Sequence, residues 1–122
     1  MNDWRTKLVK AKIEEFTADE LYLADIAKAI SHPARIKILK ILSQMDICMC
    51  GEIVDLLPLA QATVSQHLKE LKRVGLIQGE VEGPKTCYCI NKDFVNKAYL
   101  QMQKLFDDIN KECKRSCKTQ TK

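Results

Sequence analysis

The 122-residue sequence lacks any apolar run of about 18 residues, the length that a helix needs to cross a bilayer. Residues 1–8 carry charge throughout and contain no apolar core of a signal peptide. Glycine and proline are scarce, at four and three residues, which favours a compact, helix-rich chain. From these absences we expect one cytoplasmic domain with no membrane partner.

Chemistry that would indicate catalysis is also missing. The sequence has no glycine-rich phosphate loop, no evident pair of nucleophile and base, and no pair of carboxylates in a plausible cleft. Its only two histidines are His32 and His67. We therefore predict that the protein is not an enzyme and uses no organic cofactor.

Positive charge is concentrated in the second half of the chain. Residues 1–60 hold eight lysines and arginines against nine acidic residues, whereas residues 61–122 hold twelve against seven. The overall net charge of +4 thus combines −1 in the first half with +5 in the second. We expect an anionic partner such as nucleic acid to meet the second half.

Apolar spacing and turn residues predict two helices around residue 31. Pro33 suits the first turn of the second helix, with His32 before it as the N-cap, and this helix is expected to continue to about Gln44. The apolar face of the first helix consists of Leu23, Ile26, Ala27 and Ile30.

A short helix, a longer helix and a hairpin are expected next. Residues 51–57 form the short helix, which Pro58 ends because proline disfavours helical geometry in the residue before it. The longer helix covers residues 61–74 and ends at Gly75 with a left-handed cap. The expected strands are residues 77–82 and 86–90. This order predicts a mainly α fold with a small β-hairpin, a winged helix-turn-helix.

The final helix is expected to run from residue 92 to about residue 115. Its apolar residues alternate spacings of four and three, which is typical of a seam that packs against another helix. We predict a homodimer formed through residues 1–30 and 92–122, around a winged core at residues 31–91 of a single domain. Packing of both stripes against their own domain is the alternative. The stripes are Trp4, Leu8 and Ala11, and Val95, Tyr99, Met102, Phe106, Ile109 and Cys113.

The helix from residue 61 has the pattern of a DNA reader, with short polar side chains near its start and apolar residues behind them. Glutamine, serine and threonine suit base edges, whereas lysine and arginine suit phosphates. For His67 two roles stay open, a base contact and a structural hydrogen bond, of which we favour the second. The candidate DNA contacts are Gln61, Thr63, Ser65, Gln66, His67, Lys69, Lys72, Arg73 and Lys85.

Six cysteines form three close pairs, which in a reducing compartment favour metal or redox chemistry. Cys48 and Cys50 lie where a strand meets a helix, so both sulfurs can reach one ion, and the helix start would lower the pKa of a thiolate there. The pair at residues 113 and 117 shares a helix face and either packs in the seam or binds an ion. The cysteines at 87 and 89 share a strand face, where we expect packing.

The motifs now resemble the ArsR/SmtB family of metal-responsive winged-helix repressors, most closely its arsenic-responsive members. They are Ser-His-Pro-Ala-Arg-Ile at 31–36, Ile-Cys-Met-Cys-Gly-Glu at 47–52 and Thr-Val-Ser-Gln-His-Leu-Lys-Glu-Leu at 63–71. The resemblance implies a homodimer that occupies double-stranded operator DNA when metal-free and is released by its effector, which derepresses a resistance operon.

The pattern of ligands differs from the best-known members. Ile53 stands where arsenic sensors place a third cysteine, residues 1–47 contain no cysteine, and no histidine lies on the last helix. We hypothesise release by As(III) or Sb(III), with Cd(II) next and Zn(II) possible, because thiolates favour soft ions. The alternative is a thiol redox or persulfide sensor of the same fold. The candidate ligands are Cys48, Cys50, Cys113 and Cys117.

Overall fold

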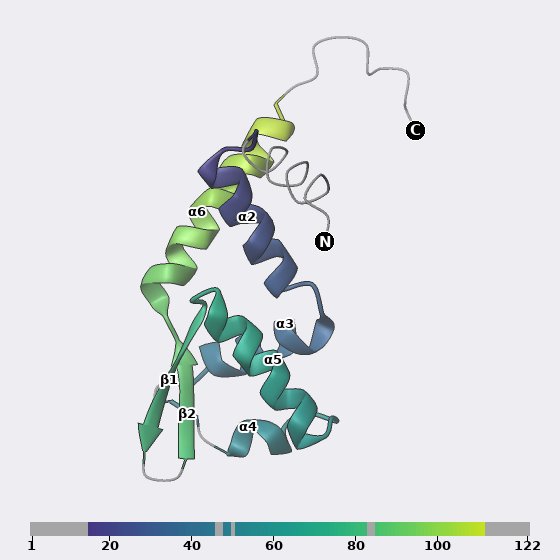
Figure 1. The fold of residues 1–122 in the computed structure, drawn as a ribbon, viewed down its shortest axis with the longest axis vertical. Coiled ribbons are helices and arrows are strands. Elements are labelled where there is room, and N and C mark those ends of the chain that lie inside the picture. Colours follow the sequence, from purple (N-terminus) through teal and green to yellow (C-terminus); the bar gives the residue numbers. More distant parts are fainter. Residues whose placement is uncertain (1–14, 46–47, 50, 83–84, 112–122) are drawn as a thin grey trace, which may run out of the picture.

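The computed structural model describes residues 15–45, 48–49, 51–82 and 85–111. Within these residues five helices and one hairpin follow one another (Figure 1). Their order is α2 (Ala18–Ala29), α3 (Pro33–Ser43), α4 (Glu52–Asp55), α5 (Gln61–Arg73), β1 (Ile77–Glu82), β2 (Lys85–Ile90) and α6 (Lys92–Ile109). The predicted mainly helical fold with a small hairpin is confirmed.

Two helices begin at residues whose side chains cap the first turn. Thr17 caps α2 in a capping box: its Oγ1 accepts from the Glu20 backbone N–H at 3.1 Å, and its own N–H donates to the Glu20 carboxylate at 2.9 Å. His32 caps α3 as predicted, because its Nδ1 accepts from the Ala34 N–H at 2.9 Å while Pro33 occupies the first helical position.

Gly75 ends α5 in the predicted left-handed conformation, with φ at +90°. This turn lets the chain reverse directly into β1, and the Leu76 N–H returns to the Leu71 carbonyl at 3.1 Å. The turn at Gly75 therefore fixes the direction in which β1 leaves the end of α5.

Two element ends differ from the sequence prediction by more than one residue. Helix α4 stops at Asp55, because Leu56 and Leu57 already make tighter hydrogen bonds, to the carbonyls three residues back, ahead of Pro58. Helix α6 ends at Ile109, and not at about residue 115. Asn110 caps it, consistent with the preference of asparagine for helix ends.

The core lies where α3, α5 and the start of β1 meet, with α4 and α6 against it. Each helix contributes the side chains of one face, while the residues at β1 continue the same apolar layer. Figure 1 shows α2 and α6 side by side at one end of the molecule, and α4 with the strands β1 and β2 toward the other. The buried cluster includes Ile26, Ile38, Leu42, Met49, Ile53, Val64, Leu68, Leu71, Leu76, Ile77 and Ala98.

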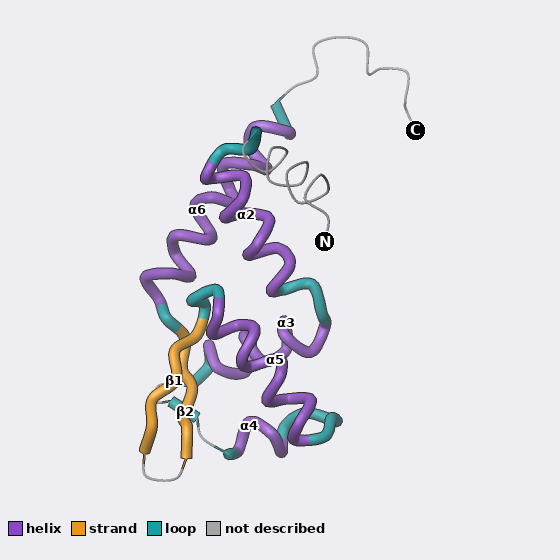
Figure 2. The backbone as a smooth tube through the Cα atoms, in the orientation of Figure 1, coloured by secondary structure: helices purple, strands orange, loops and turns teal. Residues whose placement is uncertain are grey.

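The hairpin acquires a third extended segment along β2. β1 and β2 pair antiparallel, in a register that places Gln78 opposite Cys89. On the other side of β2, Met49 and Tyr88 exchange both backbone hydrogen bonds, at 2.8 and 2.7 Å. Figure 2 shows this short loop segment beside β2. The strand β2 is therefore central, between β1 and the residues that lead into α4.

Candidate nucleic-acid interface and thiol site

Helix α5 separates an apolar face from a polar one. Val64, Leu68 and Leu71 are buried against the core. The polar side chains predicted to contact bases or phosphates lie on the exposed part of the helix, which leaves a polar surface free for a ligand. These exposed residues are Gln61, Thr63, Ser65, Gln66, Lys69, Lys72 and Arg73.

His67 belongs to the buried part of the same helix. It is only 7% exposed, its Nδ1 accepts a hydrogen bond from Arg35 Nε at 3.0 Å, and its ring contacts that of His32 at 4.4 Å between centroids. Burial, together with the charges of His32 and Arg35, lowers the pKa of His67. The buried His67 links α5 to α3 through these contacts, which supports the structural role favoured from the sequence over a base contact.

Arg73 is exposed but already has partners. Its guanidinium donates to both oxygens of Asp25 on α2, at 2.9 and 3.1 Å, and its Nη2 approaches Glu70 at 2.6 Å. Hydrogen bonds from Arg73 lower the pKa values of Asp25 and Glu70. Arg73 therefore ties the end of α5 to α2, and its phosphate contact stays a prediction. Lys85 begins β2, and its side chain lies outside the described part.

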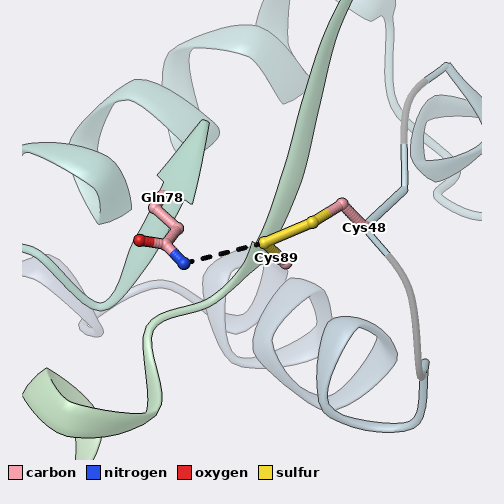
Figure 3. Close-up of a disulfide and its surroundings, with 3 residues drawn as sticks. All are labelled: Cys48, Gln78 and Cys89. Carbon is pink, nitrogen blue, oxygen red and sulfur yellow. Dashed lines mark hydrogen bonds between the residues drawn. A yellow bond between two sulfur atoms is a disulfide. The ribbon is translucent and has the colours of Figure 1, made fainter. Parts of the chain in front are cut away.

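A thiol pair forms where the Met49–Tyr88 bridge continues by one residue. In an antiparallel ladder, the pair next to a hydrogen-bonded pair brings its Cα atoms to about 4.5 Å and its side chains closest together. Cys48 and Cys89 occupy that position, with Cα atoms 4.5 Å apart, and their sulfurs are joined in a disulfide (Figure 3). The structure thus brings Cys48, 41 residues away in sequence, onto the wing.

The expectation that Cys89 merely packs was wrong. Its sulfur is bonded to Cys48 and also lies 3.9 Å from the donating Nε2 of Gln78 (Figure 3). Cys87 is buried, at 3% exposure, but it is disulfide-bonded too, and none of the cysteines in the described ranges is free. The signal available in the sequence was the matched pattern of the two motifs, Cys-Met-Cys and Cys-Tyr-Cys, which alternate as paired strands do.

Glu80 is a second residue that the sequence interpretation missed. One of its carboxylate oxygens and the sulfurs of Cys48 and Cys89 all lie within 4.8 Å of one another. A neighbouring hollow of ≈ 380 Å³, lined by both cysteines and by Lys92, opens toward the sulfurs. Of the four predicted ligands only Cys48 can be placed, since Cys50, Cys113 and Cys117 lie outside the described residues.

The donor set fits a thiophilic ion in the reduced protein. Thiolates bind soft or borderline cations, and a carboxylate is compatible with zinc-like ions. Such binding requires two thiolates in place of the disulfide. In the oxidised form, the same bond fastens the wing to the segment before α4. The site can therefore exist in two chemical states that hold the same elements together.

Comparison with known proteins identifies the family. Residues 32–78 match the family described as bacterial regulatory protein, arsR family. An uncharacterized HTH-type transcriptional regulator of Methanocaldococcus jannaschii is 37% identical over 87 residues, which cover 70% of this chain and 92% of that protein. The chain belongs to the arsR family. It is a DNA-binding regulator of transcription and not an enzyme.

Two further relatives have names that include an effector. The arsenical resistance operon repressor of Staphylococcus xylosus is 32% identical over 74 residues, 61% of this chain and 70% of that protein. The cadmium resistance transcriptional regulatory protein CadC homolog of Staphylococcus aureus is 29% identical over 104 residues, 81% of this chain and 85% of that one.

Solved structures of arsR-like proteins share the fold. An ArsR-like transcriptional regulator from Rhodococcus sp. RHA1 superposes with a TM-score of 0.63 at 20% identity, over 77% of this chain and 88% of that one. The homodimeric winged helix-turn-helix domain Mb0332 of Mycobacterium bovis gives 0.56 at 23% identity, over 95% and 96%. In the described ranges of this arsR-family chain, no helix is both long and apolar enough to cross a membrane.

Proposed function

We propose that this arsR-family protein is a homodimeric repressor, released from its operator when a thiophilic ion binds cysteine thiolates. The observation that carries the proposal is the meeting of Cys48 and Cys89 at the base of the wing. There, an ion that binds sulfur can act on the elements that flank the reader helix. The relatives named for arsenical and cadmium resistance support this class of effector.

The exposed face of α5 supports binding to double-stranded operator DNA. Gln61 and Thr63 lie in its first turn, where a recognition helix contacts base edges. Lys69 and Lys72, further along the exposed side, are placed for phosphates, which hold the protein on the duplex without specifying sequence. Buried Val64 and Leu68 keep this face turned outward.

Dimerisation is supported by the uncovered stripe of α6. Tyr99, Phe106 and Ile109 of the predicted seam are 57%, 56% and 65% exposed, whereas Val95 and Met102 pack partly on the core. A mainly apolar hollow of ≈ 340 Å³ between α2, α3 and α6 adjoins this stripe at Tyr99. Large apolar side chains in one exposed row mark an interaction site, and a second copy of the chain supplies the matching row.

The effector we propose is As(III) or Sb(III), followed by Cd(II) and then Zn(II), because the site is rich in thiols. Cys48, whose sulfur is bonded to that of Cys89 on the wing, is the member of the predicted ligand set that lies in the described residues, which supports its proposed role. Cys50, Cys113 and Cys117 remain proposed ligands from the sequence.

Fluorescence anisotropy on DNA from the upstream region of its own gene tests the proposal. The reduced full-length protein is titrated with arsenite, antimonite, cadmium or zinc, and Cys48→Ser is titrated in parallel. Ser43→Ala is the control, because it alters the hollow that Cys48 and Cys89 line without changing a thiol. We expect soft ions to release the wild type and the control, but not Cys48→Ser. Release of Cys48→Ser at the same ion concentration would contradict the proposal.

The disulfide favours a second function, a redox or persulfide switch. With peroxide as the oxidant, the two thiols give up two electrons and two protons, forming one disulfide and two waters. Because the bond joins β2 to the residues before α4, it can shift the wing relative to the reader. Peroxide should then release DNA in the absence of metal, and mass spectrometry of the oxidised protein should show a Cys48–Cys89 peptide. Absence of that peptide would exclude this function.

A further inference from the structure

Three segments bring donor atoms to one face of the wing. Gln78 and Glu80 on β1 and Cys87 and Cys89 on β2 share this face, because residues two apart in a strand point the same way and the register pairs 78 with 89 and 80 with 87. Cys48 comes from beyond the other edge of β2, opposite Cys89. The central strand thus receives a carboxylate from one side and a sulfur from the other.

The spacing of these donors suits a single ion. Two sulfurs that bind one tetrahedral zinc-like ion at about 2.3 Å lie about 3.8 Å apart, and a carboxylate oxygen binds at a similar distance. The sulfurs of Cys48 and Cys89 and an oxygen of Glu80 lie within 4.8 Å of one another, so small side-chain movements in the reduced protein suffice. Glu80 is exposed and both cysteines are half-buried, which leaves the site reachable from solvent.

We infer that Cys48, Cys89 and Glu80 of one chain form a binding site for one divalent cation of the zinc and cadmium class. The inference deepens the proposed function, on which its regulatory meaning rests, for the Cd(II) and Zn(II) effectors, by adding Cys89 and Glu80 from the wing. This ligand set lies within one subunit and does not include Cys50, Cys113 or Cys117, which stay separate candidates from the sequence. The hollow lined by both cysteines and Lys92 leaves room for a further ligand beside the two sulfurs.

Ligand chemistry determines when the site binds. Reduction of the disulfide by a water-soluble phosphine consumes one water, yields two thiols and converts the phosphine to its oxide. Each thiol then loses its proton as it binds the cation, so affinity rises with pH. Two thiolates and one carboxylate hold three negative charges close together, and the cation relieves their repulsion. One carboxylate among the donors favours a borderline divalent ion over a purely thiophilic one.

Occupation of this site would couple the wing to the reader helix. Glu80 belongs to β1, which follows α5 through the Gly75 turn, and Cys48 precedes α4, which leads into α5. A cation held by both, and by Cys89 between them, therefore fixes the wing relative to both ends of the reader. Cation binding at the wing can therefore change the affinity of the protein for DNA.

The test is a direct titration of the reduced, full-length protein with Cd(II) and no DNA, followed by the sulfur-to-cadmium absorption band and a competing chelator. We expect the wild type to bind Cd(II). The affinity of Cys48→Ser and of Cys89→Ser should each be lower by about 100-fold or more, because each change removes a direct ligand. Glu80→Gln should be weakened about 10-fold, in line with the effect of removing a weaker partner at a metal site. Glu82→Gln, the same charge change on the same strand, and Cys113→Ser/Cys117→Ser should match wild type.

Several results would overturn the inference. They are wild-type affinity in Cys89→Ser, equal affinity of Glu80→Gln and Glu82→Gln, or loss of binding in Cys113→Ser/Cys117→Ser. X-ray absorption at the cadmium edge gives a second readout. A first shell made up of sulfur alone, with no oxygen, would also contradict the inference. Circular dichroism verifies that each variant is folded. Because no DNA is present, failure here is distinct from failure of the proposed release, which the anisotropy experiment measures.

Discussion

The disulfide between Cys48 and Cys89 should contribute a measurable share of stability in the oxidised protein. The two residues are 41 apart in sequence, so the bond closes a long loop in the unfolded chain. In the chain-entropy treatment, a loop of this size closed by one bond alone loses about 13 cal/mol/K, or about 4 kcal/mol at 25 °C. This value is an upper bound, because Cys87 is disulfide-bonded as well and already restricts the unfolded chain. For a chain of this length, the upper bound corresponds to roughly 15 °C in Tm.

Urea unfolding of wild type and of Cys48→Ser/Cys89→Ser measures this difference. Both proteins are followed at one fixed chain concentration, since dimerisation makes apparent stability depend on concentration. Under oxidising conditions we expect the variant to be less stable by at most about 4 kcal/mol. With a phosphine reductant the two curves should approach each other. An identical gap with and without reductant would show that side-chain replacement, and not the bond, causes the change, which would refute the reasoning.

Three further predictions concern the histidine pair, the reader and the seam. The pKa of His67 is lowered in the folded state, so the unfolded chain binds the proton more readily. Stability should therefore fall as the pH drops below the ordinary value of 6.5. Urea unfolding at a series of pH values should show that His67→Gln flattens this dependence. Lys69→Ala should weaken DNA binding equally for all sequences and reduce the salt slope by about 1, whereas Gln61→Ala should cost about 1–3 kcal/mol on the operator only; equal losses on both DNAs would contradict this assignment. Phe106→Glu should yield monomers in sedimentation velocity, and an unchanged dimer would remove α6 from the interface.

Features set by short-range chemistry were predictable from the sequence. His32 and Pro33 start α3, and Gly75 ends α5. The capping hydrogen bond of histidine, the fixed φ of proline and the positive φ that glycine adopts each act within a few residues. The polar face of α5 was predictable for the same reason, since its apolar residues at 64, 68 and 71 recur at helical spacing.

Features that depend on long-range register were not predictable. The partner of Cys48 is decided by the Met49–Tyr88 hydrogen bonds, which join segments far apart in the chain. A shift by one residue would turn Cys89 to the other face. Glu80 was overlooked for a related reason, because a single carboxylate has no signature until the strand that carries it has a neighbour. His67 became a structural residue only once α3 brought Arg35 and His32 against it.

The central claim is that a thiol site at the base of the wing controls the DNA reader. Its most direct test is the anisotropy of labelled upstream DNA bound to the reduced, full-length protein, as a soft ion is added to wild type and to Cys48→Ser/Cys89→Ser. The account predicts that the ion releases DNA from the wild type while the double variant stays bound with its metal-free affinity. Equal release from both proteins would contradict it, and would place control of the reader outside the wing.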